Sequence, residues 1–319
     1  MATLIGRLDL DRLRQWLPLA TLIVLVALIG TLQPVFLLPA TLLELAGDTA
    51  VLFILATGVT FVIMLGGIDL SIQSMASLAS VVVAITLSSL GYWSFVLAVA
   101  LGGLAGLLSG LAHTRLRIPS FIATLAMGGV LFSTALVTSG EKSITLEVSE
   151  RDYLAWITGS ALGIPNVVVI GLIVLVVAHV LQAHTRFGRY SAAIGAGEPA
   201  AYASGVKVNR QKVIAYVLSA AFAALAGVIL AGRLASGSPT LAAEMLLPSI
   251  AAVVVGGTAI TGGVGSIWRT LVGALIISVV RIGMTFLGVN IFAQNIVFGV
   301  VLIAAVAITI DRSKIPIVK

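Results

Sequence analysis

Long apolar runs alternate with short polar breaks along almost the whole chain of 319 residues. A helix needs about 20 apolar residues to cross the hydrocarbon core of a bilayer, and the runs have this length. The runs are continuous and do not alternate between apolar and polar positions, which disfavours a transmembrane β-barrel. The pattern predicts ten membrane-spanning helices, at roughly Trp16–Leu37, Thr49–Leu65, Ser71–Leu90, Trp93–Ala112, Ser120–Val137, Asn166–Gln182, Val213–Gly232, Glu244–Ile260, Leu271–Leu287 and Ile291–Ile310.

The composition supports an all-α polytopic membrane protein. Hydrophobic residues make up 60% of the chain and charged residues only 9%, whereas soluble domains are about 45–50% apolar and about 25% charged. So few charges cannot cover a water-facing surface, and the high hydrophobicity also excludes a disordered chain. The chain has no cysteine, which excludes disulfides and cysteine-ligated metals.

The basic residues predict the orientation of the helices. Cytoplasmic loops carry an excess of Lys and Arg. With the N-terminus inside, 14 of the 18 basic residues fall on the cytoplasmic side: Arg7, Arg12, Arg14, Arg115, Arg117, Arg186, Arg189, Lys207, Arg210, Lys212, Arg269, Arg312, Lys314 and Lys319. We therefore expect both termini in the cytoplasm. The segments are then a cytoplasmic N-terminal segment 1–15, one transmembrane domain 16–310 with an external loop 139–165 and a cytoplasmic loop 184–211, and a cytoplasmic tail 311–319.

The chain lacks the motifs of several enzyme classes. It has no G-x-x-x-x-G-K-[ST] phosphate loop, no H-E-x-x-H pair and no G-x-S-x-G serine elbow. We therefore expect no catalytic residue, metal or cofactor in this chain. A transporter, a channel or a structural membrane subunit remains.

The cytoplasmic loop 184–211 contains a predicted short surface helix. Pro199 suits the first helical turn, Glu198 is favourable at its positive end, and Gly205 suits its exit. The small side chains of Ala200 and Ala201 would form a docking surface for another protein; a solvated connector is the alternative. Loops of this length are uncommon in compact domains unless they have a function, which favours docking.

Two glycine-rich breaks interrupt the apolar runs. Gly66 and Gly67 end one predicted helix, and Asp69 or Ser71 can cap the next. An ionisable residue near membrane depth is also a functional candidate, so Asp69 has two interpretations. The second break, residues 256–266, has five glycines in eleven positions. Such a segment is a break, a hinge or a close backbone contact, because glycine weakens a helix.

Other polar and glycine positions fall inside the predicted spans. A stripe at every fourth position, Gly102, Gly106 and Gly110, indicates helix packing. Polar side chains at membrane depth line a path or bond to neighbouring helices, and the sequence does not choose between these roles for Arg281, Gln294 and Asn295.

Several stretches together resemble the sugar-type permease subunits of bacterial ABC importers. This is the ribose/xylose/galactose group, which includes branched-chain amino-acid permeases at greater distance. The matching stretches are G-G-I-D-L-S at 66–71, I-P-S-F-I-A-T-L at 118–125, A-I-G followed by E, A-A and S-G-V within 193–206, I-A-A-V-V-V-G-G-T at 250–258 and G-G-V-G-S at 262–266. They occur in the family's order and cover about Thr49 to Asp311.

The resemblance implies a multi-pass permease of the bacterial inner membrane that moves a sugar, polyol or related small polar solute inward by alternating access. ATP hydrolysis would occur on separate ATP-binding-cassette subunits; the other partners would be a periplasmic sugar-binding protein and a second permease copy or homologue, with no nucleic acid. The implied ATPase-coupling residues are Gly195, Glu198, Pro199, Ala200, Ala201 and Gly205. The translocation or hinge candidates are Gly66, Gly67, Asp69, Ser71, Pro119, Phe121, Gly256, Gly257 and Asn295.

The sequence departs from the family pattern at four positions. Gln73 stands where the family usually has glycine, Phe132 and Tyr202 stand where many members have arginine, and Pro248 replaces an acid. These differences leave the solute and the matching ATPase open. The alternative functions are a ten-helix secondary transporter of the drug/metabolite type and a structural membrane subunit.

Overall fold

A computed structural model of the protein describes residues 2–309. Each of the ten predicted spans overlaps a helix. The long helices are α1 (Ala2–Leu32), α2 (Pro39–Met64), α3 (Ile72–Leu90), α4 (Trp93–Arg115), α5 (Ser120–Ser139), α7 (Asn166–His184), α10 (Val208–Leu234), α12 (Ile267–Phe286) and α13 (Ile291–Thr309), and α11 (Leu246–Val255) is shorter. The predicted tail 311–319 lies outside the described residues.

Seven of the described helices are long and apolar enough to cross a membrane, namely α2, α3, α4, α5, α7, α10 and α12. Shorter apolar stretches, of 10–17 residues, lie at Trp16–Leu32 in α1, Ala243–Val255 around α11 and Ala293–Val306 in α13. The protein is therefore an all-α polytopic membrane protein, as the apolar pattern predicts.

Several boundaries differ from the prediction. The first helix begins at Ala2, so the predicted N-terminal segment is helical from that residue. Helix α2 begins at Pro39 rather than Thr49, because Pro39 at its first position is compatible with a helix start. Helix α11 ends at Val255, before the predicted Ile260, where the glycine-rich segment begins.

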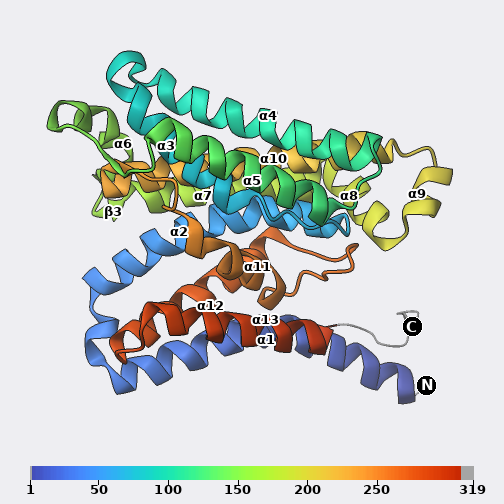
Figure 1. Cartoon of the computed structure of the whole chain (residues 1–319). Coiled ribbons are helices and arrows are strands. Elements are labelled where there is room, and N and C mark those ends of the chain that lie inside the picture. The colour runs from blue at the N-terminus through green and yellow to red at the C-terminus, as the bar shows by residue number, and fades with distance from the viewer. Residues whose placement is uncertain (1, 310–319) are drawn as a thin grey trace.

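Helix α2 forms the centre of the bundle. Every residue from Thr49 to Met64 is buried. Figure 1 shows α3, α4 and α5 on one side of α2 and α1, α12 and α13 on the other. Helix α10 contacts α2, α3 and α4, while α12 contacts α1, α2 and α11. The apolar core therefore follows α2 and extends into both sides.

The glycine stripe of α4 is a packing surface, as predicted. A Cβ atom at Gly102 would lie 2.6 Å from the carbonyl oxygen of Ala220, and one at Gly110 would lie 2.9 Å from the Cα atom of Val213. A Cβ atom at Gly106 would overlap the carbonyl oxygen of Tyr216. The backbones of α4 and α10 therefore touch along an antiparallel pair, which only glycine permits.

The loop 139–165 is a small folded unit. Its elements are β1 (Ile144–Thr145), η2 (Val148–Leu154), α6 (Ala155–Thr158), β2 (Ser160–Ala161) and β3 (Ile164–Pro165). Strand β1 pairs antiparallel with β4 (Ser236–Gly237), which follows α10, and β2 pairs with β3. The remaining short helices are η1 (Pro34–Leu37), η3 (Ala243–Met245), α8 (Arg186–Ala196) and α9 (Glu198–Ala203). Helices α8 and α9 lie at the opposite end of the bundle from α6 and β3, at the end where α1 begins (Figure 1).

Candidate coupling surface and translocation residues

The predicted short helix is α9. It begins at Glu198 with Pro199 in its first turn, and its last turn closes at Gly205, which has φ +80°. The amide of Val206 donates a hydrogen bond of 3.1 Å to the carbonyl oxygen of Ala201 across this turn. This is the glycine-terminated helix exit that the sequence predicts.

Helix α8, which precedes α9, was not predicted from the sequence. Thr185 caps α8, and its hydroxyl oxygen accepts a hydrogen bond of 3.1 Å from the amide of Phe187. A threonine before a helix is a recognisable start signal. Gly188 and Gly195 weaken the helix signal of this segment, because glycine is a poor helix former.

One predicted docking residue does not lie on the exposed surface. Ala201 is 5% exposed, because its face of α9 packs against the protein's own chain. Helix α9 contacts α8 and α10, and an ion pair of 2.8 Å joins Glu198 to Lys212 of α10. The exposed face of α9 instead presents Ala200 and Tyr202, the latter 74% exposed.

Three of the glycine motifs meet in space, at a contact that we call the glycine junction (Gly66, Gly195, Gly262 and Gly263). A Cβ atom at Gly195 would overlap the backbone of Met64 and Gly263. One at Gly262 would lie 2.8 Å from the amide nitrogen of Gly66 and 3.0 Å from the Cα atom of Gly195. The ends of α2 and α8 and the segment before α12 are therefore in direct backbone contact.

The two predicted glycine breaks end their helices in the same way. Gly66 has φ +76° and Gly257 has φ +92°. In each case the amide of this glycine bonds to the carbonyl three residues earlier, and the next amide bonds to the carbonyl five residues earlier. These are Schellman caps, which favour glycine at the left-handed position. Gly256 instead allows close packing of two backbones, because a Cβ atom there would overlap the backbone of Arg269 in α12.

Gln182 of α7 holds the glycine-rich segment in place, a role that was not predicted from the sequence. Its Nε2 donates a hydrogen bond of 2.7 Å to the carbonyl oxygen of Gly265, and its Oε1 accepts one of 2.9 Å from the amide of Ile267. A partly buried amide that satisfies two backbone groups fixes their positions. The sequence carries no signal for it, because the partners are more than 80 positions away.

Asp69 is buried, and both of its carboxylate oxygens accept hydrogen bonds from other groups of the protein. Its Oδ1 accepts hydrogen bonds from the amide (2.9 Å) and hydroxyl (2.6 Å) of Ser71, and its Oδ2 accepts one of 2.8 Å from the hydroxyl of Ser219 in α10. Ser71 is the N-cap residue of α3, but its side chain accepts no capping hydrogen bond from the first turn of the helix. The carboxylate therefore joins the start of α3 to the middle of α10.

The second motif stretch, at the start of α5, contacts the same loop. Ser120 and Thr124 accept hydrogen bonds of 3.2 and 3.1 Å from backbone amides of the G-G-I-D-L-S segment. Pro119 is the N-cap of α5, and the side chain of Phe121 is 48% exposed at the beginning of the helix. The structure thus brings Pro119 close to the loop that holds Asp69.

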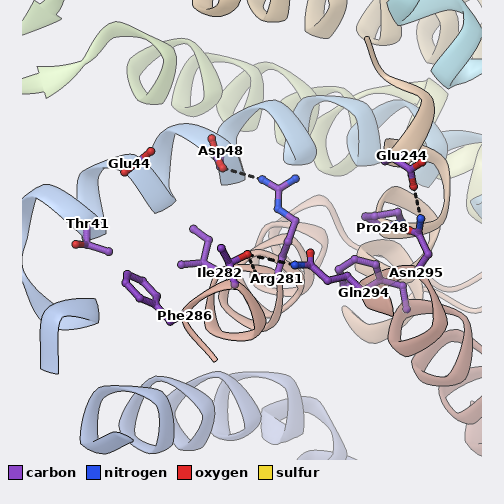
Figure 2. A pocket seen from close by; sticks show the side chains of 12 residues that line it. Thr41, Glu44, Asp48, Glu244, Pro248, Arg281, Ile282, Phe286, Gln294 and Asn295 are labelled. Carbon is purple, nitrogen blue, oxygen red and sulfur yellow. Dashed lines mark hydrogen bonds and ion pairs between the residues drawn. The ribbon is translucent and has the colours of Figure 1, made fainter. Parts of the chain in front are cut away.

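The last candidate, Asn295, lies at a different place, in a pocket of about 440 Å³ between α2, α12 and α13. Figure 2 shows its side chain directed at Glu244, to which it donates a hydrogen bond. Arg281 forms an ion pair of 2.7 Å with Asp48, which also pairs with Arg233 of α10 at 2.7 Å. Asp48, Arg281 and Asn295 of this pocket therefore bond to neighbouring elements, while Glu44 also lines it.

A second cavity, of about 390 Å³, lies between α3, α5 and residues 239–243. Two of the four departures from the family pattern line it, Gln73 from α3 and Phe132 from α5. Three small polar side chains, Ser74, Ser77 and Thr240, also line it, together with the apolar residues Leu70, Leu125, Gly128, Gly129, Pro239 and Ala243. Of the other departures, Pro248 lines the first pocket and Tyr202 lies on the surface of α9.

Comparison with known proteins places the chain in a family. Residues 41–306 match the family described as the permease component of branched-chain amino acid transport systems. The chain is 39% identical to the ribose import permease protein RbsC of Escherichia coli K12 over 93% of each chain. It is 39% identical to RbsC of Bacillus subtilis 168 over 97% of this chain and 96% of that protein. It is 34% identical to the L-arabinose ABC transporter permease protein AraH of Azospirillum brasilense over 89% and 84%. The chain therefore belongs to this family of ABC importer permeases, as a sugar permease of its branched-chain/ribose family.

Proposed function

We propose that the protein is the permease subunit of an importer that moves a sugar or related small polar solute into the cytoplasm by alternating access. ATP is hydrolysed on separate ATP-binding-cassette subunits. The relatives named for ribose and L-arabinose support a solute of the pentose, hexose or polyol class. The secondary-transporter alternative lacks such support.

The observation that carries the proposal is the glycine junction behind α8 and α9. An ATPase that docks on the exposed face of α9 would move α8, whose Gly195 rests on the backbone of Met64 and Gly263. No flexible side chain separates these backbones, so little of the displacement would be lost in side-chain motion. The motion would reach α2 and α12 directly, and a shift of packed helices is a common form of switching.

The orientation follows from the same surface. We place α8 and α9 in the cytoplasm, because Arg186, Arg189, Lys207, Arg210 and Lys212 lie on or beside them. Helix α1 begins at this end of the bundle (Figure 1), so we place the N-terminus in the cytoplasm. Similarity to bacterial importer permeases supports the bacterial inner membrane as the location. The basic residues Arg312, Lys314 and Lys319 support a cytoplasmic C-terminus as well.

The other partners belong to the remaining surfaces. The folded unit of residues 139–165 lies at the end opposite α8 and α9, which makes it the docking surface for a periplasmic sugar-binding protein. The exposed face of α5 carries Ser133 and Thr134. Small and polar residues are typical of helix–helix contacts in membranes, so we assign this face to a second permease copy.

The test is transport by the reconstituted complex. The permease, its ATPase subunits and its binding protein are placed in proteoliposomes, and uptake of radiolabelled ribose, arabinose, xylose and galactose is measured with and without ATP. We expect uptake of at least one sugar only when ATP and the ATPase are both present. Equal uptake by the permease alone would support a secondary transporter and contradict the proposal.

The docking surface is tested with matched arginine substitutions. Ala200→Arg places a charge on the exposed face of α9, and Ala161→Arg makes the same change on the exposed strand β2 at the other end. We expect Ala200→Arg to abolish copurification of the ATPase subunits and Ala161→Arg to preserve it. Retained copurification in Ala200→Arg would place the ATPase elsewhere. Ala201→Arg is unsuitable, because its side chain is buried and the change would disturb folding.

A further inference from the structure

We propose that the cavity between α3, α5 and residues 239–243 is a solute-binding site of the permease, where Gln73 and Phe132 select among neutral sugars. The inference rests on the proposed function. It goes further, because it places part of the selectivity in this chain as well as in the binding protein.

The cavity presents hydrogen-bonding groups that the protein leaves free. Within the described residues, neither the amide of Gln73 nor the hydroxyl of Ser74, which is 9% exposed, has a hydrogen-bond partner. The hydroxyl oxygen of Ser77 accepts a bond of 3.1 Å from the amide of Ala242, which leaves its own hydrogen free to donate. Ser74 and Ser77 are buried and Gln73 is partly exposed. Together these side chains offer the hydrogen-bond donors and acceptors that suit a hydroxylated ligand.

The wall of the cavity also offers an apolar surface. Phe132 projects from α5 and is 38% exposed. A sugar ring has C–H groups on its faces and hydroxyls around its edge, so an aromatic ring can cover a face while amides and hydroxyls bind the edge. Beside it, a Cβ atom at Gly129 would have no neighbour within 4 Å. The glycine therefore leaves room next to the ring.

The charge of the cavity identifies the class of solute. No Asp, Glu, Lys or Arg is among the described residues that line it. An amino acid would need partners for its carboxylate and ammonium groups, because an unpaired charge is costly away from water. A neutral polyol needs only hydrogen bonds. The volume of about 390 Å³ is within the range of about 300–1,000 Å³ that is usual for small-molecule sites.

The first pocket does not compete for this role. Its Arg281 is paired with Asp48, and its Asn295 is bonded to Glu244, as Figure 2 shows. Because these groups are already paired, they offer a neutral solute less hydrogen bonding than the free groups of the cavity beside α3 do.

The proposed site is tested directly by the selectivity of the transporter between two sugars. The ratio of kcat/KM for the two sugars that the wild-type complex transports fastest is measured with one binding protein throughout. One hydrogen bond contributes about 1 kcal/mol, so Gln73→Ala should change this ratio about fivefold. The matched control is Gln33→Ala, which removes an amide outside the cavity and should leave the ratio unchanged. Phe132→Leu should lower kcat/KM for both sugars, and Phe132→Tyr should retain most of it.

Protection from labelling tests binding without transport. Because the chain has no cysteine, Gln73→Cys and Gln33→Cys each introduce a single thiol. We expect the better-transported sugar at saturating concentration to slow maleimide labelling of Gln73→Cys at least threefold and to leave Gln33→Cys unchanged. Unprotected labelling, together with an unchanged ratio in Gln73→Ala that copurifies normally with the ATPase, would overturn the site. Absence of ATP-driven uptake in the wild-type complex would instead contradict the proposed function.

Discussion

The amide nitrogen of Gly263 donates a hydrogen bond of 2.9 Å to the carbonyl oxygen of Met64, the last residue of α2. This bond joins two segments that lie almost 200 positions apart. Gly195 of α8 rests directly on it. At this contact α8 is thus fixed to the most buried helix of the protein through backbone atoms, and the rings of Phe187 in α8 and Phe61 in α2 pack beside each other as well.

The first prediction concerns that contact. In Gly195→Ala the new methyl group would overlap the backbone of Met64 and Gly263, and backbone atoms can move only with their helices. Overpacking of this kind costs about 1–3 kcal/mol. We expect a lower thermal unfolding temperature in detergent and a reduced ATP-coupled uptake rate.

Gly197→Ala is the control. Gly197 is extended, with φ 179°, and the nearest atom to a Cβ there is the Cβ of Ala200 at 3.9 Å. The added methyl group should leave the unfolding temperature unchanged. If both variants unfold at the same temperature as the wild type, the junction does not constrain α8.

The glycine junction also shows where sequence reasoning ends. The apolar runs predict the spans because the length of a helix is a local property, and the cap at Gly205 is equally local. That Gly66, Gly195 and Gly262 touch depends on how distant helices pack, and their sequence spacing carries no such information. Gln182 was missed for the same reason, and Ala201 was misplaced because the covered face of α9 is set by α8 and α10.

The second prediction concerns Asp69. Asp69→Ala leaves three donors, two on Ser71 and one on Ser219, without their acceptor. An unsatisfied buried group costs about 1–3 kcal/mol, so we expect a large fall in the unfolding temperature. Asp69→Asn keeps one acceptor oxygen for Ser71, and its amide can donate to Ser219. It should unfold near the wild-type temperature and retain uptake.

The outcome separates two roles for Asp69. If Asp69→Asn is as stable as the wild type but does not transport, the negative charge itself takes part in gating. If Asp69→Asn transports and Asp69→Ala is unstable, the carboxylate acts as a connection between α3 and α10. The three hydrogen bonds within the chain favour the second result.

The third prediction concerns the contact between α4 and α10. Alanine is the better helix former by about 1 kcal/mol, yet Gly106→Ala should be destabilising, because its methyl group would overlap the backbone of Tyr216 and Val217. Gly103→Ala, on the same helix, meets only a methyl group of Val217 at 3.9 Å and should be neutral or slightly stabilising. Thermal unfolding in detergent distinguishes them, and equal stability of the two variants would contradict the packing role.

The fourth prediction concerns the ion pairs of Asp48. One carboxylate joins α2 to Arg233 of α10 and to Arg281 of α12. Asp48→Ala leaves two guanidinium groups that repel each other in a partly buried place. Removal of one partner of a buried pair costs about 3–5 kcal/mol, and we expect the lower end, because the Asp48 side chain is 25% exposed.

A double-mutant cycle tests this interpretation. Arg281→Leu alone should cost less than Asp48→Ala, because the pair between Asp48 and Arg233 remains. The double variant should be more stable than the sum of the single changes predicts, since removing Arg281 also removes the repulsion. Lys212→Ala is the comparison, because its partner Glu198 is half exposed and such pairs contribute about 0–1 kcal/mol. If Asp48→Ala is no more destabilising than Lys212→Ala, the pairs of Asp48 do not hold the three helices together, and its carboxylate is free to act in the pocket beside α12.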